Sequence, residues 1–285
     1  MRIETRNMVP DAGLDRTLYL TEKKGLIVRR DGPSVWIKEE GSAGRRIPAR
    51  LVNMVVVIGN ILLDTGVVAL FSENNVPIMF MNVKCQEVAV AAPSGGEKPD
   101  YGNIQRFFLE STDRVSAYIS WARSKRRRIR HLVRSSCAEQ KEGPLAMVWP
   151  GAAEMEKTIA YARREDPLVF TTAFDIIDDL ARDMIIGMLQ KTCLDPHAGI
   201  LHRNARFGFA RDICFMVEAE TEAQAAAFAF SAREEHFLVS GPKSRIPSRE
   251  GMKRIIEAFE GRKAALTRYV GDVLSSYVRF ARRVA

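Results

Sequence analysis

A cluster of turn-forming residues divides the chain into two parts with different hydrophobic patterns. Residues 92–102, APSGGEKPDYG, combine Pro, Gly, Ser and Asp, a composition typical of a loop or linker. The segment 17–91 before it contains short alternating runs, which favour β-strands. The segment after it has apolar residues at helical spacing. The sequence therefore predicts an α+β protein with a β-rich domain at 1–91, a linker at 92–102 and a larger α-helical domain at 103–285.

The β-rich segment contains recognisable turns and one buried strand. The run TLYLTEKKGLIVRRDGPSVWIKEE predicts a hairpin that turns at Asp31-Gly32. The β-branched run 55–58 is long enough for a buried strand. A helix is predicted over 61–72, where Asn74-Asn75 would end it, and a strand follows at 76–81.

Helical patterns continue to the end of the chain. We expect helices within 103–136, 152–165, 167–190, 206–230 and 249–283, with a break at the KEGP sequence of 141–144. We find no internal repeat.

Composition limits the classes of partner and compartment. Among 285 residues, 43 are Lys or Arg and 35 are Asp or Glu, which gives a net charge of +8 and a pI near 9.5. This bias fits a polyanion such as nucleic acid, although many basic proteins bind none. The four cysteines include no CxxC pair, which argues against a zinc ribbon and favours a reducing cytoplasm. MRIETRNMVPD is not a signal peptide, and no apolar run reaches the length of about 18 residues that a membrane span needs.

One predicted helix carries a concentrated positive charge. Eight Lys and Arg residues lie between Arg114 and Arg134, without any acid. On a helix, Arg123, Arg127 and Arg130 share a face, with Arg126 beside them. This face would either bind nucleic-acid phosphates or simply be solvated, and four consecutive cations require a counter-charge. Nearby Tyr118 and Trp121 could stack on bases, although aromatic residues on a helix are more often core.

Separate segments supply side chains that could hold a metal ion. The stretch 194–215, LDPHAGILHRNARFGFARDICF, contains two of the four histidines. Asp195-Pro196 predicts a helix start, and His197 is expected to be incidental. His202 and Asp212 alone are a weak metal signal. With Glu154 from another helix they would form an oxygen and imidazole set suited to Mn²⁺ or Mg²⁺, although Glu154 is also an ordinary helix-start acid.

Several segments of the chain resemble a known family, the CRISPR-associated spacer integrases, which are the larger proteins of CRISPR adaptation. The β-rich part resembles the family's opening over TLYLTEKKGLIVRRDG and IPARLVNMVVVIGNILLDTGVVALFSENNVPIMFMN. Glu154 precedes Tyr161 by seven residues, as in the family. LDPHAGILH is similar to the family's Leu-Asp-Pro-x-x-Gly-x-Leu-His, and FARDI and SREGMKRIIEAFEGR resemble its last helices.

The resemblance implies a function and a set of roles. It implies a metal-dependent DNA integrase and endonuclease, in which Mg²⁺ or Mn²⁺ activates a 3′-OH to attack a phosphodiester at the CRISPR repeat. Glu154, His202 and Asp212 would be the catalytic and metal-binding residues. The expected partners are double-stranded DNA, a second copy of the chain joined through the 1–91 domain, and a small ferredoxin-like protein. The residues that would contact DNA are Arg123, Arg126, Arg127, Arg130 and Tyr161.

Some residues depart from the family's pattern. The family usually has an acid three residues after the position of Asp212, where this chain has Phe215. On a helix this places an apolar ring on the same face as Asp212. The family's Phe-Arg-Pro is absent, and Met155 replaces a Gly. Asp212 would therefore act as the sole acid of its helix, Glu218 would contribute after a local shift, or the protein would be a weakly active or inactive paralogue that binds DNA as a scaffold.

Overall fold

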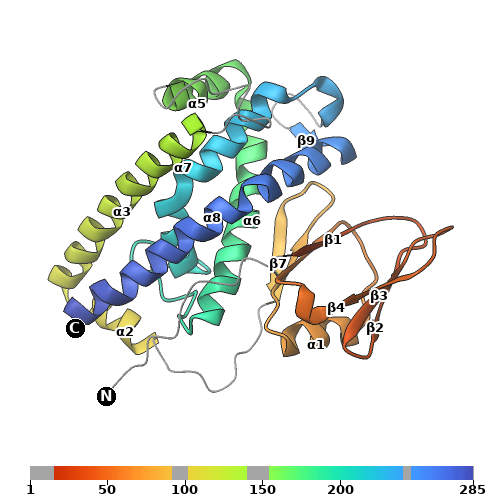
Figure 1. Ribbon diagram of the computed structural model, residues 1–285, viewed down its shortest axis with the longest axis horizontal. Coiled ribbons are helices and arrows are strands. Elements are labelled where there is room, and N and C mark those ends of the chain that lie inside the picture. Colours follow the sequence, from red (N-terminus) through yellow and green to blue (C-terminus); the bar gives the residue numbers. More distant parts are fainter. Residues whose placement is uncertain (1–15, 92–101, 140–153, 240–244, 285) are drawn as a thin grey trace. The chain divides into compact units, whose positions relative to one another are not determined.

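The computed structural model describes residues 16–91, 102–139, 154–239 and 245–284 (Figure 1). The linker predicted at 92–102 lies outside this part except for its last residue, and the KEGP break lies wholly outside it. The described chain begins with strands and continues mainly as helices, which confirms the α+β class.

Contacts group the chain into a strand-rich and a helical unit. The strand-rich unit comprises Pro10–Asp100 and Ile186–Leu194, and the helical unit takes Tyr101–Ile185 and Asp195–Ala285. The domain bounds and the linker at 92–102 stay predictions, because residues 92–101 lie outside the described part of the chain. The grouping of 186–194 with the strands could not be read from local sequence, because these residues continue a helical pattern.

The strand-rich unit contains two sheets. The four-stranded sheet has the order β1-β5-β6-β7, in which β1, β5 and β6 are parallel and β7 is antiparallel. The three-stranded antiparallel sheet has the order β2-β3-β4. The elements are β1 Thr17–Thr21, β2 Ile27–Asp31, β3 Ser34–Lys38, β4 Arg45–Pro48, β5 Met54–Ile58, α1 Thr65–Glu73, β6 Ile78–Met81 and β7 Glu87–Ala91.

The local predictions for this unit are mostly confirmed. β2 and β3 form the hairpin, in which Asp31 pairs with Ser34 and Gly32 takes a left-handed φ of 59°. All five residues of β5 are buried, as the β-branched run predicts. The predicted helix begins four residues later than expected, because Asp64 caps α1 by accepting from the N–H of Gly66 at 2.9 Å. Asn74 and Asn75 end it, the latter with a left-handed φ of 56°.

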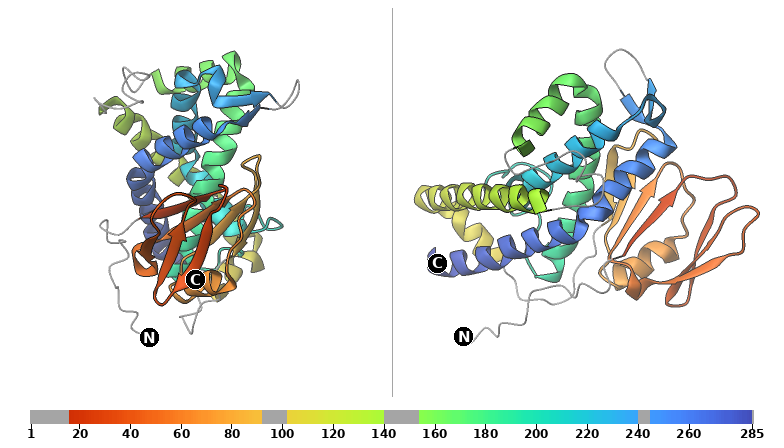
Figure 2. Two further views of the ribbon diagram at one scale, coloured as in Figure 1. Left: turned by 90° about the vertical axis from the view of Figure 1, so that its right-hand side faces the viewer. Right: turned by 45° about the horizontal axis from the view of Figure 1, so that its top comes forward.

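The helical unit is built around one almost fully buried helix. Helix α7 packs against α3, α5 and α8, and Figures 1 and 2 show the beginning of α3 beside the end of α8. Trp121 and Phe280 stack there with their rings 5.2 Å apart. The elements are α2 Gly102–Phe107, α3 Thr112–Glu139, α5 Glu154–Glu165, α6 Pro167–Lys191, α7 Gly208–Ser231, β8 Phe237–Val239, β9 Arg245–Pro247 and α8 Arg249–Val284. None of the described helices is both long and apolar enough to cross a membrane.

The structure corrects two expectations for this unit. The helical pattern of 103–136 is broken at Ser111, whose backbone is extended, so α2 and a short 3-10 turn precede α3. Strands β8 and β9, in a segment for which the sequence predicts no element, pair as a two-stranded antiparallel sheet. No helix begins at Asp195-Pro196; the reason lies in the contacts of the loop that follows.

A buried ion pair joins α7 to α8. The guanidinium of Arg262 donates to both carboxylate oxygens of Glu220 at 2.7 Å and to the hydroxyl of Ser136 at 3.1 Å. Gln224 donates to the same carboxylate at 3.0 Å. Because both charges are buried, each is stable there only in the presence of the other.

Removal of one of these charges is predicted to destabilise the helical unit. Glu220→Gln removes the carboxylate that the buried guanidinium of Arg262 binds at two points, and we expect the free energy of unfolding to fall by about 3–5 kcal/mol. The matched control is Glu257→Gln, which breaks exposed pairs with Lys253 and Arg254 and is expected to cost under about 1 kcal/mol. Urea denaturation of both variants checks this. Equal losses would contradict it.

Candidate active site

The carboxylate of Asp212 lies at the centre of the candidate site. It is completely buried on the first turns of α7. One oxygen accepts from the backbone N–H groups of Ile200 and Leu201 at 2.8 and 3.0 Å and from the hydroxyl of Tyr118 at 3.1 Å. The other accepts from the backbone N–H of His202 at 2.9 Å and lies 2.8 Å from its ring Nδ1. These five contacts occupy the lone pairs that two carboxylate oxygens offer.

The loop between α6 and α7 is shaped to reach this carboxylate. Gly199 passes so close to Gly208 that a Cβ on Gly199 would lie 2.5 Å from the Gly208 carbonyl carbon. The carbonyl of Pro196 accepts from the N–H groups of Phe209 and Ala210 at 2.9 and 3.2 Å, which caps the start of α7.

The same loop shows why Asp195-Pro196 does not begin a helix. The side chain of Asp195 accepts from the N–H of His197 at 2.8 Å, which closes a turn. The fully buried side chain of Gln105 holds the backbone of Asp195 through two hydrogen bonds of 2.9 and 2.8 Å. The N–H groups from 200 to 202 turn toward Asp212, and this excludes helical hydrogen bonds.

His202 is fixed at one ring nitrogen and open at the other. Its side chain is 41% exposed, whereas Asp212 is not exposed at all. When Nδ1 donates to Asp212, the neutral imidazole keeps its lone pair on Nε2, so that nitrogen can bind a metal ion or accept a proton. The arrangement is that of a histidine oriented by a buried acid.

The phenols of Tyr118 and Tyr277, beside Asp212, stay protonated. Burial raises the pKa of the Tyr118 phenol well above its ordinary value, and the negative charge of Asp212 raises it further. Burial, again with Asp212, also raises the pKa of Tyr277. Tyr118 therefore belongs to the core and stabilises Asp212. The sequence left open whether Tyr118 is a core residue or stacks on bases, and it did not indicate the hydrogen bond to Asp212.

One helical turn after Asp212, α7 carries an aromatic ring that is covered by a guanidinium group of α3. The guanidinium carbon of Arg126 lies 4.2 Å from the centroid of the half-buried Phe215 ring. Arg126 also forms an ion pair with Glu218. Glu218 is therefore engaged with α3.

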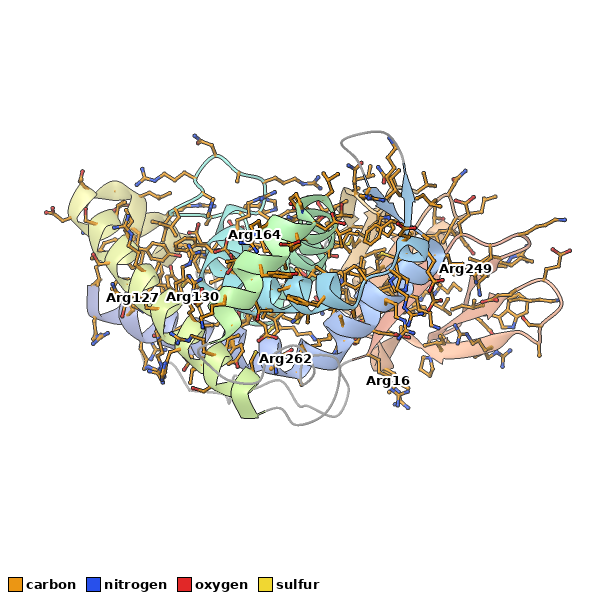
Figure 3. The ribbon with its side chains drawn as sticks, turned by 90° about the horizontal axis from the view of Figure 1, so that it is seen from above. Arg16, Arg127, Arg130, Arg164, Arg249 and Arg262 are labelled. Carbon is orange, nitrogen blue, oxygen red and sulfur yellow. The ribbon has the colours of Figure 1, made fainter. Side chains whose placement is uncertain are left out.

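The other predicted DNA-contacting residues differ in their surroundings. Arg130 donates to both oxygens of Glu156 at 2.6 and 2.7 Å, and these hydrogen bonds hold the pKa of Glu156 below its usual range. Arg123 and Arg127 are exposed on α3 and have no ion pair within the described chain. Figure 3 labels Arg127 and Arg130 on this helix. Tyr161 is half-exposed and stacks on Phe230 at 5.3 Å.

The remaining predicted residue stands at the edge of the described structure. Glu154 is the first residue of α5, and its side chain is not among those described. The next residue, Met155, is fully buried. In the described residues, no group of three His, Cys, Asp or Glu side chains is arranged to hold a metal ion. The structure thus brings together His202 and Asp212, and the metal-binding role of the set that includes Glu154 stays a prediction.

The described residues fit a divalent ion only in part. The imidazole of His202 offers an open nitrogen, as a ligand requires. Asp212 has no lone pair left unless it releases the loop, and at the next turn Phe215 and Arg126 provide a ring and a positive charge. The described part of α7 therefore supplies no ready ligand.

Solved structures with the same fold come from proteins that are distant in sequence. A CAS1 protein from Thermotoga maritima matches with a TM-score of 0.72 and 15% identity, over 93% of this chain and 96% of that one. A casposase bound to integration product has a TM-score of 0.66 and 12% identity, with coverages of 86% and 82%. A chain of a Cas6-RT-Cas1–Cas2 complex has a TM-score of 0.62 and 14% identity, and covers 92% of this chain and 33% of that one. No curated protein matches the sequence.

A family model agrees with the fold. The model of CRISPR associated protein Cas1 matches residues 18–168, which is more than half of the chain. The chain belongs to the Cas1 family. The matched region includes Glu154 and ends before the loop that carries His202. The contact between His202 and Asp212 was therefore found without the help of the family match.

We predict that Asp212 stabilises the loop in addition to any chemical role. Asp212→Asn replaces an acceptor oxygen by a donor amide that faces N–H groups. We expect the free energy of unfolding to fall by about 3 kcal/mol, because at least one buried group then loses its partner. The control is Asp113→Asn, an exposed residue at the start of α3. Chemical denaturation measures both, and an Asp212→Asn variant as stable as the control would contradict the prediction.

Proposed function

We propose that this Cas1-family chain is a DNA integrase of CRISPR adaptation that acts in the cytoplasm. In the proposed reaction, the 3′-OH of an incoming DNA fragment attacks a phosphodiester at the CRISPR repeat. The observation that carries the proposal is the pair His202–Asp212, which presents an imidazole with one nitrogen fixed and the other open. Family membership and a fold shared with an integrating casposase support it.

The proposed roles follow from what each side chain can do. His202 would bind an ion or a proton through Nε2. Asp212 would act through His202, because its oxygens are occupied by the loop. Glu154 would supply the anionic oxygen, with Mg²⁺ or Mn²⁺ as the expected ion. Such an ion, when bound, polarises the phosphate and stabilises the leaving oxygen.

The proposed DNA surface is the exposed side of α3. Arg123 and Arg127 are exposed and form no ion pair with another described residue, and such guanidinium groups suit backbone phosphates. Arg126 and Arg130 would contribute from their ion pairs, and Tyr161 would contact DNA near the start of α5. The proposed partners are double-stranded DNA, a second copy of the chain through the 1–91 domain, and a small ferredoxin-like protein. A Cas1–Cas2 complex among the structures of similar fold supports the last of these.

A second candidate function is a DNA-binding scaffold with little or no catalysis. Phe215 and the guanidinium above it favour this candidate, because they occupy the turn of α7 where a second acid would be expected. The scaffold predicts salt-sensitive binding of duplex DNA without turnover.

A half-site integration assay with Mg²⁺ or Mn²⁺ separates the two candidates. If the chain is an integrase, wild type joins a labelled fragment to a repeat-containing duplex. We expect His202→Ala and Glu154→Ala to lower the rate at least about 100-fold, as for removal of a group that stabilises charge in the reaction.

The control for this assay is His197→Ala, which alters an exposed ring of the same loop that contacts Phe207 and should retain the rate. Activity that survives both His202→Ala and Glu154→Ala would show that the assigned site is wrong. DNA binding without joining in wild type would favour the scaffold.

A further inference from the structure

We propose that Arg126, stacked on Phe215, is a fixed phosphate-binding cation that replaces a metal-binding acid on α7. The proposal rests on the proposed DNA-binding function and specifies its chemistry at one point. The ligand is a single phosphate group of the DNA backbone, and the contact needs no divalent ion.

The position of Arg126 is determined by two contacts on the same helix. Its guanidinium carbon lies 4.2 Å from the ring centroid of Phe215, and its NH2 nitrogen forms an ion pair with Glu218, one turn further along α7. A guanidinium held at once by a ring and by a carboxylate has few alternative positions. Tyr118, two turns earlier on α3, bonds Asp212 on α7. Arg126 is therefore presented on the side of α7 that carries Asp212.

The guanidinium retains donors for a ligand. Stacking on an aromatic ring uses its flat face, whereas the five N–H donors of a guanidinium lie in its plane. Its NH2 donates to Glu218. The Nε and NH1 groups donate to no acceptor within the described residues, and the side chain is 30% exposed. Each of these two groups can donate to an oxygen of a bound phosphate.

The surrounding charges favour an anion rather than a cation at this point. Arg123, one turn earlier on α3, is exposed and without an ion pair in the described chain. Phe215 offers no ligand atom, and the charge of Arg126 repels a second cation nearby. An acid introduced at position 215 alone would pair with Arg126. Conversion of this turn into a metal ligand therefore requires changes at both positions.

The first test measures DNA binding without metal. Fluorescence anisotropy with a labelled duplex in EDTA compares the full-length wild type with Arg126→Lys and Arg126→Gln. We expect Arg126→Gln to weaken binding about tenfold, as for loss of a charged hydrogen bond. It should also reduce the slope of log affinity against log salt by about one. Arg126→Lys retains the charge but loses the planar guanidinium and its stacking, and we expect it to weaken binding about threefold or more.

The matched control is Arg128→Gln, which removes one exposed positive charge from the same helix. It is expected to change the affinity less than about threefold, as for a solvated charge. Thermal unfolding of each variant confirms that it is folded. Arg126 variants that bind like Arg128→Gln would overturn the proposal, as would binding by wild type that requires Mg²⁺.

The second test measures ion binding without DNA or activity. Mn²⁺ titrations followed by electron paramagnetic resonance compare wild type, Phe215→Glu and the double variant Phe215→Glu/Arg126→Gln. We expect the double variant to bind Mn²⁺ at least about tenfold more tightly than wild type, because it has gained an acid and lost a cation. Phe215→Glu alone should change the affinity less than about threefold. Equal tightening in the single and double variants would contradict a blocking role of Arg126.

The outcomes separate this inference from the proposed function. If wild type binds and integrates DNA but the Arg126 variants have the same DNA affinity as Arg128→Gln, only the inference about Arg126 is overturned. Wild type that binds no DNA overturns both.

Discussion

The buried carboxylate of Asp212 is the point at which the loop, the central helix and the open imidazole are joined. Its five contacts bring the backbone of 200–202 onto α7, and the same oxygen that accepts the N–H of His202 also orients its ring. A buried carboxylate is stable only when its lone pairs are satisfied. The loop supplies most of these donors, and the same hydrogen bonds fix the position of the loop. Stability and the presentation of His202 therefore depend on one group.

Ion pairs between residues far apart in the sequence connect α3 to the helices around it. The concentrated positive charge of α3 is balanced by Glu218, Glu156 and, through Lys125, by Asp272. This answers how four consecutive cations are tolerated: some face acids on neighbouring helices, while others face solvent. The same helix can thus contribute both to packing and to a surface that suits phosphates.

The two-part architecture and most helices could be predicted because their signals are local and periodic. Strand β5 and the hairpin at Gly32 follow from β-branched residues and turn chemistry. The break at Ser111 could not be predicted, because the surrounding pattern reads as helix. The sequence predicts no strand at β8 or β9, which have only three residues each. The helix start predicted at Asp195-Pro196 is wrong for a related reason. This pair has the composition of a helix start, but Gln105, ninety residues away, holds its backbone in a turn.

The pairing of His202 with Asp212 could be anticipated from a motif, whereas its geometry could not. The motif names both residues but does not show that Asp212 is saturated or that Arg126 covers Phe215. Hydrogen exchange of individual amides tests this geometry most directly. The amides of Ile200, Leu201 and His202 are expected to be protected in wild type, because each donates to Asp212. In Asp212→Asn they should exchange at least about 100-fold faster while α8 is unchanged. Rapid exchange of these three amides in wild type would contradict the account.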